Sequence, residues 1–156
     1  MLLPFFEWCE ATAVGHAIRT SLWLFPVIES VHLLALALLG GALLVVDLRL
    51  FGVGLRDQPA RQLARDAQPW VIGALLVMIS TGVPLFLSES IKCYHNPAFW
   101  VKISTLPVAI LFTFTVRWKV ATADEARIGS WSKLVALVSL SLWFGVAAAG
   151  RWIGFS

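Results

Sequence analysis

Long apolar stretches alternate with short polar segments along this chain. The apolar stretches cover about residues 22–47, 69–88, 98–117 and 134–153. Each is near the ~20 residues that an α-helix needs to cross the roughly 30 Å hydrocarbon core of a bilayer. Because the connections are short, consecutive helices should run antiparallel. The pattern therefore predicts an all-α fold, a four-helix up-down bundle integral to the membrane, with residues 1–156 forming one transmembrane domain.

A shorter amphipathic segment precedes the first span, at residues 4–19. Pro4 suits the first turn of a helix, and Phe5, Trp8 and Thr12 recur at three- and four-residue steps. This spacing places them on one side of a helix. We therefore expect an interfacial amphipathic helix that lies in the membrane surface with its aromatic side chains toward lipid.

Small residues recur at every fourth position in two of the expected spans. Ala37 and Gly41 do so in the first span, and Ser141, Gly145 and Ala149 in the fourth. Such spacing lets helices approach one another closely. We expect these residues to pack within the bundle, with a contact between copies of the chain as the alternative.

Composition agrees with a membrane protein. The 156 residues are 59% hydrophobic and only 13% charged, whereas soluble domains carry about 25% charged residues. The net charge of +3 does not indicate nucleic-acid binding, because no basic stripe with interleaved aromatic residues is present. Basic residues in the loops of a membrane protein instead set its orientation and contact anionic lipid.

The basic residues are distributed unevenly between the two sides of the expected bundle. Eight of the twelve follow the first and third spans: Arg49, Arg56, Arg61, Arg65, Arg117, Lys119, Arg127 and Lys133. The other side has Arg19, Lys92, Lys102 and Arg151. By the positive-inside rule, the two basic loops are cytoplasmic. We therefore expect a multi-pass protein of the bacterial inner membrane with both termini in the periplasm.

Two ionisable residues, Glu29 and His32, lie one helical turn apart inside the first span. Burying such groups in hydrocarbon costs several kcal/mol unless they find partners, so they should face the bundle interior. A histidine in this position is often hydrogen-bonded across the bundle, here to Ser80 or Thr81.

For Glu29, the corresponding structural explanation is an ion pair with Arg19, Lys102 or Arg151. Each of these three basic residues falls on the same side of the expected bundle as Glu29. The carboxylate would then be neutralised within the protein, as buried charges usually are.

The same side of the bundle also collects residues suited to a b-type haem. Iron takes imidazole as an axial ligand, and the haem propionates favour Lys or Arg near the membrane surface. His32 is the candidate buried ligand, with Lys102 and Arg151 near the propionates. His95 is either a second ligand, if its loop dips inward, or a partner of a propionate or Glu29. A difference in depth argues against one iron shared by His32 and His95, because roughly 15 Å of helix rise separates His32 from the start of its span.

Other metal sites have less support in the sequence. A di-iron carboxylate bundle needs two Glu-x-x-His motifs and two further Glu residues, and this chain has one such motif. No tight ligand set for zinc is evident. Copper stays open, because five suitable side chains fall on or near the same side: Cys9, His16, His32, Cys93 and His95. A disulfide between the two cysteines is possible there, although sequence does not show their proximity.

Three segments carry a resemblance to a known group of proteins: FPVIESVHLLALALLGGALLVVDLRLFG, KCYHNPAFWVKI and AAAGRWI. They resemble a family of small, uncharacterised bacterial four-span membrane proteins. That family has a Glu-Ser-x-His-like signature in its first span, a Tyr-His-Asn segment before an aromatic-x-x-Lys, and Ala-Gly-Arg closing its last span. The resemblance covers about Trp23 to Arg151.

More loosely, the chain is similar to copper-resistance D-type membrane domains and to small cytochrome b-like subunits. The family resemblance implies a four-span architecture and implies no activity. It also implies a shared site made of five residues: Glu29, His32, His95, Lys102 and Arg151.

The sequence leaves three candidate functions. The first is a b-type cytochrome-like subunit that transfers electrons between a quinol in the bilayer and a periplasmic partner, with haem b bound at His32 and His95. The second is a non-catalytic accessory subunit of a larger membrane complex or a homo-oligomer, favoured by the lack of a sizeable extramembrane domain. The third is copper or small-solute handling. We do not expect the chain to be an enzyme on its own.

Overall fold

The computed structural model describes residues 1–124 and 129–155. This part of the chain is helical and contains no strand. In chain order the elements are α1 (Leu3–Glu10), α2 (Ala13–Thr20), α3 (Leu24–Phe51), α4 (Ala60–Ser88), α5 (Ser90–His95), α6 (Pro97–Phe112), the π-helical segment η1 (Thr113–Arg117), α7 (Trp118–Ala121) and α8 (Ser130–Phe155).

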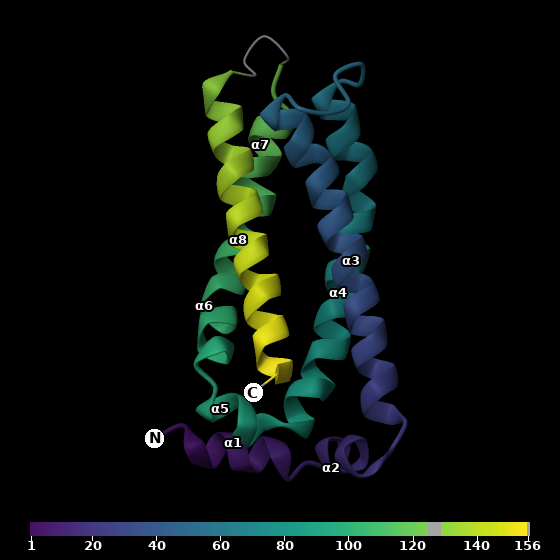
Figure 1. The fold of residues 1–156 in the computed structure, drawn as a ribbon, viewed down its shortest axis with the longest axis vertical. Coiled ribbons are helices and arrows are strands. Elements are labelled where there is room, and N and C mark those ends of the chain that lie inside the picture. Colours follow the sequence, from purple (N-terminus) through teal and green to yellow (C-terminus); the bar gives the residue numbers. More distant parts are fainter. Residues whose placement is uncertain (125–128, 156) are drawn as a thin grey trace.

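Four helical stretches of the described chain are long and apolar enough to cross a membrane: Leu24–Phe51, Ala60–Ser88, Pro97–Ala121 and Ser130–Phe155. They run up and down side by side, and both termini lie at the end where α1, α2 and α5 cross the bundle (Figure 1). We call this the terminal end, and the opposite end the basic end. The predicted all-α four-helix membrane bundle is confirmed.

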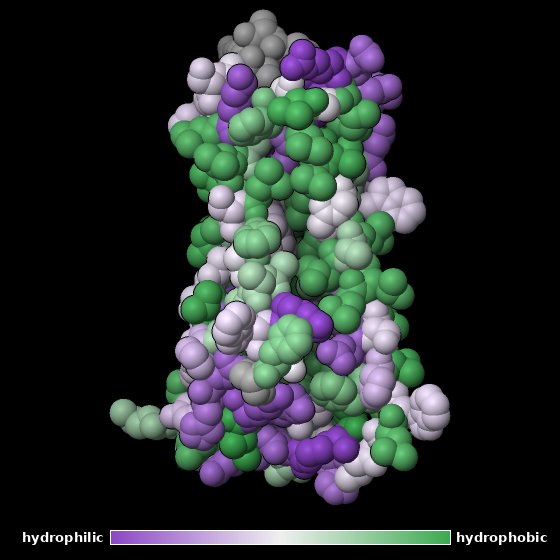
Figure 2. Space-filling view, viewed as in Figure 1, coloured by the Kyte–Doolittle hydropathy of each residue, from purple (hydrophilic) through white to green (hydrophobic). Residues whose placement is uncertain are grey.

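The faces of the long helices that lack protein neighbours are apolar. Leu34, Leu76, Leu111 and Phe144 are each more than 60% exposed. On the face shown in Figure 2, a hydrophobic belt covers the long helices, and hydrophilic residues gather at both ends. A surface of this kind is stable against lipid tails and not against water. The chain is therefore a multi-pass membrane protein.

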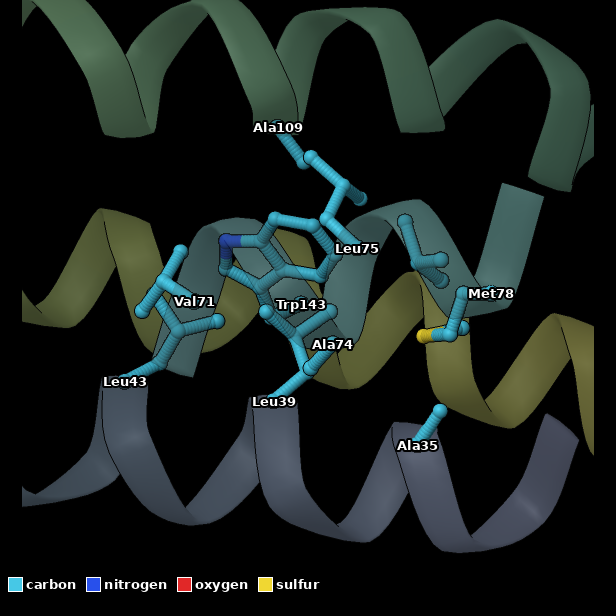
Figure 3. Packing of buried hydrophobic residues seen from close by; sticks show 10 residues of the cluster. Ala35, Leu39, Leu43, Val71, Ala74, Leu75, Met78, Ala109 and Trp143 are labelled. Atoms are coloured by element: carbon cyan, nitrogen blue, oxygen red, sulfur yellow. The ribbon is translucent and has the colours of Figure 1, made fainter. Parts of the chain in front are cut away.

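The main core lies midway along the bundle and is centred on Trp143 of α8. Its indole packs among Leu39 and Leu43 of α3, Leu75 of α4 and Ala109 of α6 (Figure 3). The indole Nε1 donates a hydrogen bond of 2.9 Å to the Thr113 hydroxyl. All four spans thus meet around one large side chain whose polar atom is satisfied.

The expected small-residue contacts form only in part. Ala149 of α8 is buried, but Ala37 and Gly41 of α3 are exposed. A methyl group added at Gly41 or Gly145 would meet no atom within 4 Å. These positions therefore do not mediate close helix packing within the chain.

Helix α4 begins earlier than the sequence indicates. The apolar pattern starts the second span at about residue 69, but residues 60–68 form the first turns of α4 and Pro69 lies inside it. Ala60 and Ala64 are buried in a second core cluster with Val46 and Leu50 of α3. This packing holds the extension in place and offsets the hydrogen bond that Pro69 cannot make.

The expected single interfacial helix at residues 4–19 is two helices, α1 and α2. The break falls at Ala11 and Thr12, where the Thr12 hydroxyl accepts a hydrogen bond of 3.2 Å from the Gly15 N–H and caps α2. Phe5 and Trp8 are exposed, as expected. Phe6 is buried and packs against the rings of four residues: Phe86, Tyr94, Phe99 and Trp100.

Polar contacts tie α1 and α2 to the end of α4. Arg19 forms an ion pair of 3.1 Å with Glu10 and donates to the Ser88 carbonyl. Glu10 in turn accepts a hydrogen bond of 2.8 Å from the Ile91 N–H at the start of α5. These contacts therefore hold α1 and α2 against the ends of α4 and α5 at the terminal end of the bundle.

Candidate functional site

His32 of α3 is anchored by Thr81 of α4. The imidazole Nδ1 lies 2.8 Å from the Thr81 hydroxyl oxygen. That hydroxyl has one hydrogen, which it donates to the Val77 carbonyl at 2.7 Å, as threonine commonly does inside a helix. We therefore infer that the Thr81 oxygen accepts from His32 and that Nδ1 carries a proton. In the neutral imidazole, Nε2 then has a free lone pair.

A glycine provides the space for this imidazole. A Cβ atom at Gly82 would lie 3.3 Å from the His32 Cε1 atom, which is tighter than an ordinary van der Waals contact. Thr81 and Gly82 are adjacent on α4, so one residue fixes the ring by a hydrogen bond and the next allows it to approach.

Lys102 of α6 is half-buried and lies against α8. A Cβ atom at Gly150 would lie 3.4 Å from the Lys102 ammonium nitrogen and 3.7 Å from the Cε atom. Within the described chain, Lys102 forms no hydrogen bond and no ion pair. Its charge is close enough to His32 for the two groups to interact electrostatically.

These contacts place one polar layer inside the terminal half of the bundle, and each of the four spans contributes to it. We define the polar layer by its five residues: His32, Thr81, Gly82, Lys102 and Gly150. Of the five residues expected to share a site, His32 and Lys102 lie near enough to interact electrostatically, and no hydrogen bond between them is formed in the described chain.

Glu29 does not join the polar layer through any contact of the described chain. Its side chain is half-buried and makes no hydrogen bond or ion pair there. The three expected ion pairs are not formed, since Arg19 pairs with Glu10 at 3.1 Å and neither Lys102 nor Arg151 approaches Glu29.

His95 and Arg151 lie apart from the polar layer. His95 ends α5 and is exposed, with its ring edge-on to Tyr94 at a centroid distance of 5.1 Å. It lines an open depression of about 570 Å³ together with Met1, Leu2, Tyr94 and Trp100. The Arg151 guanidinium is exposed and lies 4.3 Å from the centre of the Phe155 ring.

Two side chains of the polar layer are of the types that a haem site uses. The free Nε2 lone pair of His32 is the ligand that iron requires, and Lys102 provides a positive charge without an acidic partner. His95 does not fit as the second ligand, because it lies in the layer that crosses the end of the bundle (Figure 1). Among the described residues, no three or more His, Cys, Asp or Glu side chains are placed to hold a metal ion.

A second polar cluster, which sequence analysis missed, lies at the basic end. Arg117 donates from Nε to the Asp47 carboxylate at 2.6 Å and from Nη2 to the Leu43 carbonyl at 3.0 Å. Ser139 of α8 donates to the other Asp47 oxygen at 2.7 Å. Asp47 and Arg117 are 0% and 4% exposed.

We had assigned Arg117 to a basic loop that only sets orientation, and that assignment is wrong. The available signal was Asp47, an acid within the apolar run Leu-Leu-Val-Val-Asp-Leu. A charge inside such a run needs a partner of opposite sign.

Cys9 and Cys93 are buried and both are free thiols. They belong to α1 and α5, which pack against each other. Burial, reinforced by the nearby Glu89 carboxylate, raises the pKa of the Cys93 thiol to about 11. The thiol is therefore protonated at neutral pH and is a poor nucleophile.

Comparison with known proteins assigns the chain to a family but not to an activity. A model of a family of unknown function (DUF6644) matches residues 5–156, so the chain belongs to that family. No curated protein and no solved structure matches it.

Proposed function

We propose that this member of a family of unknown function is a membrane b-type cytochrome-like subunit, in which His32 is the axial ligand of a haem b. One observation carries the proposal: Nδ1 of His32 lies 2.8 Å from the Thr81 hydroxyl oxygen, whose hydrogen is donated to Val77, and we infer from this that Nδ1 is protonated and that the Nε2 lone pair is free. A bound haem would supply one-electron transfer, here between a quinol in the bilayer and a periplasmic partner.

The surroundings of His32 support this role. Histidines that bind metals usually donate their second ring N–H to a protein oxygen, which fixes the tautomer and the orientation of the ring. Thr81 accepts that hydrogen bond from His32. Gly82 leaves room for the ring.

The expected orientation agrees with electron transfer on the periplasmic side. Arg49, Arg56, Arg61 and Arg65 lie in or near the connection between α3 and α4, and Lys119 and Lys133 lie on either side of the connection between α7 and α8. The positive-inside rule would place that end in the cytoplasm and the polar layer in the periplasmic half.

An absorption spectrum tests the proposal. Protein purified from haem-replete cells should show a Soret band and reduced-minus-oxidised peaks of the b type. His32→Ala should abolish them. His95→Ala and His16→Ala are matched controls that should retain them. Colourless, iron-free wild-type protein, or an unchanged spectrum in His32→Ala, would overturn the proposal. Metal analysis of the same preparation distinguishes haem iron from copper.

The second candidate is a non-catalytic subunit of a larger membrane complex or a homo-oligomer, and it is favoured by the small residues on α3. Ala37, Gly40 and Gly41 are exposed, and a methyl group at either glycine would meet nothing within 4 Å. Small residues permit close helix contacts in membranes. Gly41→Leu should then release a partner during mild detergent purification, whereas Gly73→Leu should not. Retention of every partner in Gly41→Leu contradicts this role.

A further inference from the structure

The terminal end of the bundle has an open depression of about 570 Å³, apart from the polar layer. It lies where α5, the start of α6 and the chain before α1 meet, and it is lined by Met1, Leu2, Tyr94, His95 and Trp100. Small-molecule sites commonly have volumes of about 300–1,000 Å³. Because α1 and α5 lie across the ends of the spans (Figure 1), the depression is at the level of the membrane interface.

One wall of the depression is the indole of Trp100, and its neighbours hold it in place. The indole Nε1 donates a hydrogen bond of 2.9 Å to the Tyr94 carbonyl. The rings of Phe6, Tyr94 and Phe99 lie at centroid distances of 5.9, 6.1 and 5.7 Å from it. Trp100 nevertheless stays partly exposed. A flat ring can therefore stack on a surface that is already ordered, which lowers the entropy cost of binding.

Two polar groups beside this wall have no hydrogen-bond partner within the described chain. They are the hydroxyl of Tyr94 and the imidazole of His95, whose rings meet edge to face at a centroid distance of 5.1 Å. A neutral imidazole has one donor and one acceptor nitrogen, and a tyrosine hydroxyl both donates and accepts. Each group can therefore bind either a carbonyl or a hydroxyl oxygen of a ligand.

The side chains that line the depression include no carboxylate, ammonium or guanidinium group. A phosphate is normally bound by such cations, which form strong charge-assisted hydrogen bonds with it. The nearest basic residue along the chain, Lys92, is paired with Glu89 at 3.8 Å. The lining therefore favours an uncharged ring that carries oxygen substituents.

An exposed stripe leads from the depression along α6. Trp100, Ser104, Val108 and Leu111 recur at four- and three-residue steps, which places them on one face of the helix. Val108 and Leu111 are more than half exposed. The Ser104 hydroxyl donates to the Trp100 carbonyl at 2.8 Å, so it does not leave an unpaired polar group on this face. The stripe suits a hydrocarbon tail that extends from a ring in the depression.

We propose that the depression binds the headgroup of a membrane quinone or quinol, with His95 hydrogen-bonded to a ring oxygen, Trp100 covering one ring face and the tail lying along α6. The choice of a quinone rests on the proposed function, which takes electrons from a quinol in the bilayer. His95 then binds the substrate and not the iron.

The experiment measures how tightly two quinones bind to the protein in lipid nanodiscs, relative to nanodiscs without protein. The probes are radiolabelled decylubiquinone and a naphthoquinone with a decyl tail, which represent the one-ring and two-ring headgroups. Radiolabelled decylbenzene has the tail and a ring but no oxygen atoms. Wild-type protein should bind one of the quinones about tenfold or more tightly than decylbenzene, because only the quinones form hydrogen bonds.

Variants assign this preference to the two residues. His95→Ala should weaken quinone binding about tenfold, and His95→Gln, which keeps a donor, should retain most of it. Trp100→Ala should weaken binding and Trp100→Phe should retain part of it. His16→Ala and Trp23→Ala are the matched controls, because both residues are exposed at the same end and neither lines the depression. Thermal melting identifies any variant that fails to fold, and exposed His95 then provides the decisive comparison.

The Soret band of the same preparations separates this inference from the proposed function. Quinone binding that depends on His95 in protein without a Soret band supports the quinone site and overturns the haem proposal. A Soret band that depends on His32, in protein whose quinone binding is absent or unchanged in His95→Ala, supports the haem and overturns the quinone site. The absence of both signals overturns both.

Discussion

Arg117 donates a hydrogen bond of 2.6 Å to Asp47 inside the basic end of the bundle, where the two side chains are 5% and 0% exposed. The pair joins α3 to the π-helical segment η1, and Ser139 adds α8 through its own bond to Asp47. A π-helical segment rotates the residues that follow it relative to the positions they would have in a continuous α-helix. The pair therefore fixes how three spans are placed against one another.

We predict that Asp47→Ala strongly destabilises the protein. Removing one partner of a buried ion pair costs about 3–5 kcal/mol, because the other charge stays buried without compensation. Thermal unfolding in detergent measures the loss. Asp124→Ala is the control, since it removes the exposed ion pair with Arg61 and should cost less than about 1 kcal/mol. Similar melting curves for the two variants would contradict the prediction.

Gly15→Ala should destabilise the packing of α2 on α4. A Cβ at Gly15 would clash with the Leu87 carbonyl oxygen and lie 3.0 Å from its carbon, and neither backbone atom moves easily. Overpacking of this kind typically costs about 1–3 kcal/mol. Gly73→Ala, in an exposed part of α4 with no atom within 4 Å of the new Cβ, should be neutral or stabilising by up to about 1 kcal/mol. Equal melting temperatures for Gly15→Ala and Gly73→Ala would contradict this prediction, because they would show that α2 shifts to accept the new Cβ without loss of stability.

Trp143→Ala should leave a cavity at the centre of the bundle. Residues of the three other spans form one core cluster with this side chain, which is 9% exposed. Substituting a buried tryptophan by alanine costs about 3–5 kcal/mol. Trp143→Phe keeps most of the packing but leaves the Thr113 hydroxyl without its indole donor, so it should cost about 1 kcal/mol. In the same unfolding measurement, Trp143→Ala should be much less stable than Trp143→Phe. The reverse order would contradict the packing around Trp143.

Alkylation of Cys93 should be slow at neutral pH and should accelerate up to a pH of about 11, where the thiol ionises. The variant Cys9→Ser isolates this thiol, and the rate with iodoacetamide is measured as a function of pH. Because the unfolded thiol ionises at a lower pH than the folded one, the stabilising contribution of the neutral thiol is present below pH 9.0 and decreases as the pH rises toward about 11. A rate that reaches half of its maximum at about pH 9.0, the ordinary pKa of the thiol, would contradict the raised pKa.

The orientation predicted from charge can be tested by thiol labelling in whole cells. With both native cysteines replaced by serine, a cysteine at Ser21, before α3, should react with a membrane-impermeant maleimide. A cysteine at Gln58, between α3 and α4, should react only after the cells are opened. Labelling of Gln58→Cys in intact cells would show the opposite orientation, with the polar layer in the cytoplasmic half.

The polar layer shows the limit of sequence reasoning for the candidate site. Helical spacing placed His32 inside a span and named Thr81 among its hydrogen-bond partners, and the structure has that contact. Sequence did not indicate that Gly150, and not Arg151, meets Lys102. Which of two neighbouring residues faces the interior depends on the rotation of α8 about its axis, and that rotation follows from packing around Trp143.

The sequence by itself determined the number of spans, their antiparallel order and the placement of both termini at the same end of the bundle. Bilayer thickness and the cost of exposing polar groups to lipid act on each segment separately, so local hydropathy is sufficient for these properties. The tertiary structure alone decided that Asp47 and Arg117 are partners, since 69 residues separate them in the chain and the pair forms only when α3 and η1 are packed together. It also decided that His95 stays at the surface, because α5 lies across the end of the bundle and does not enter it.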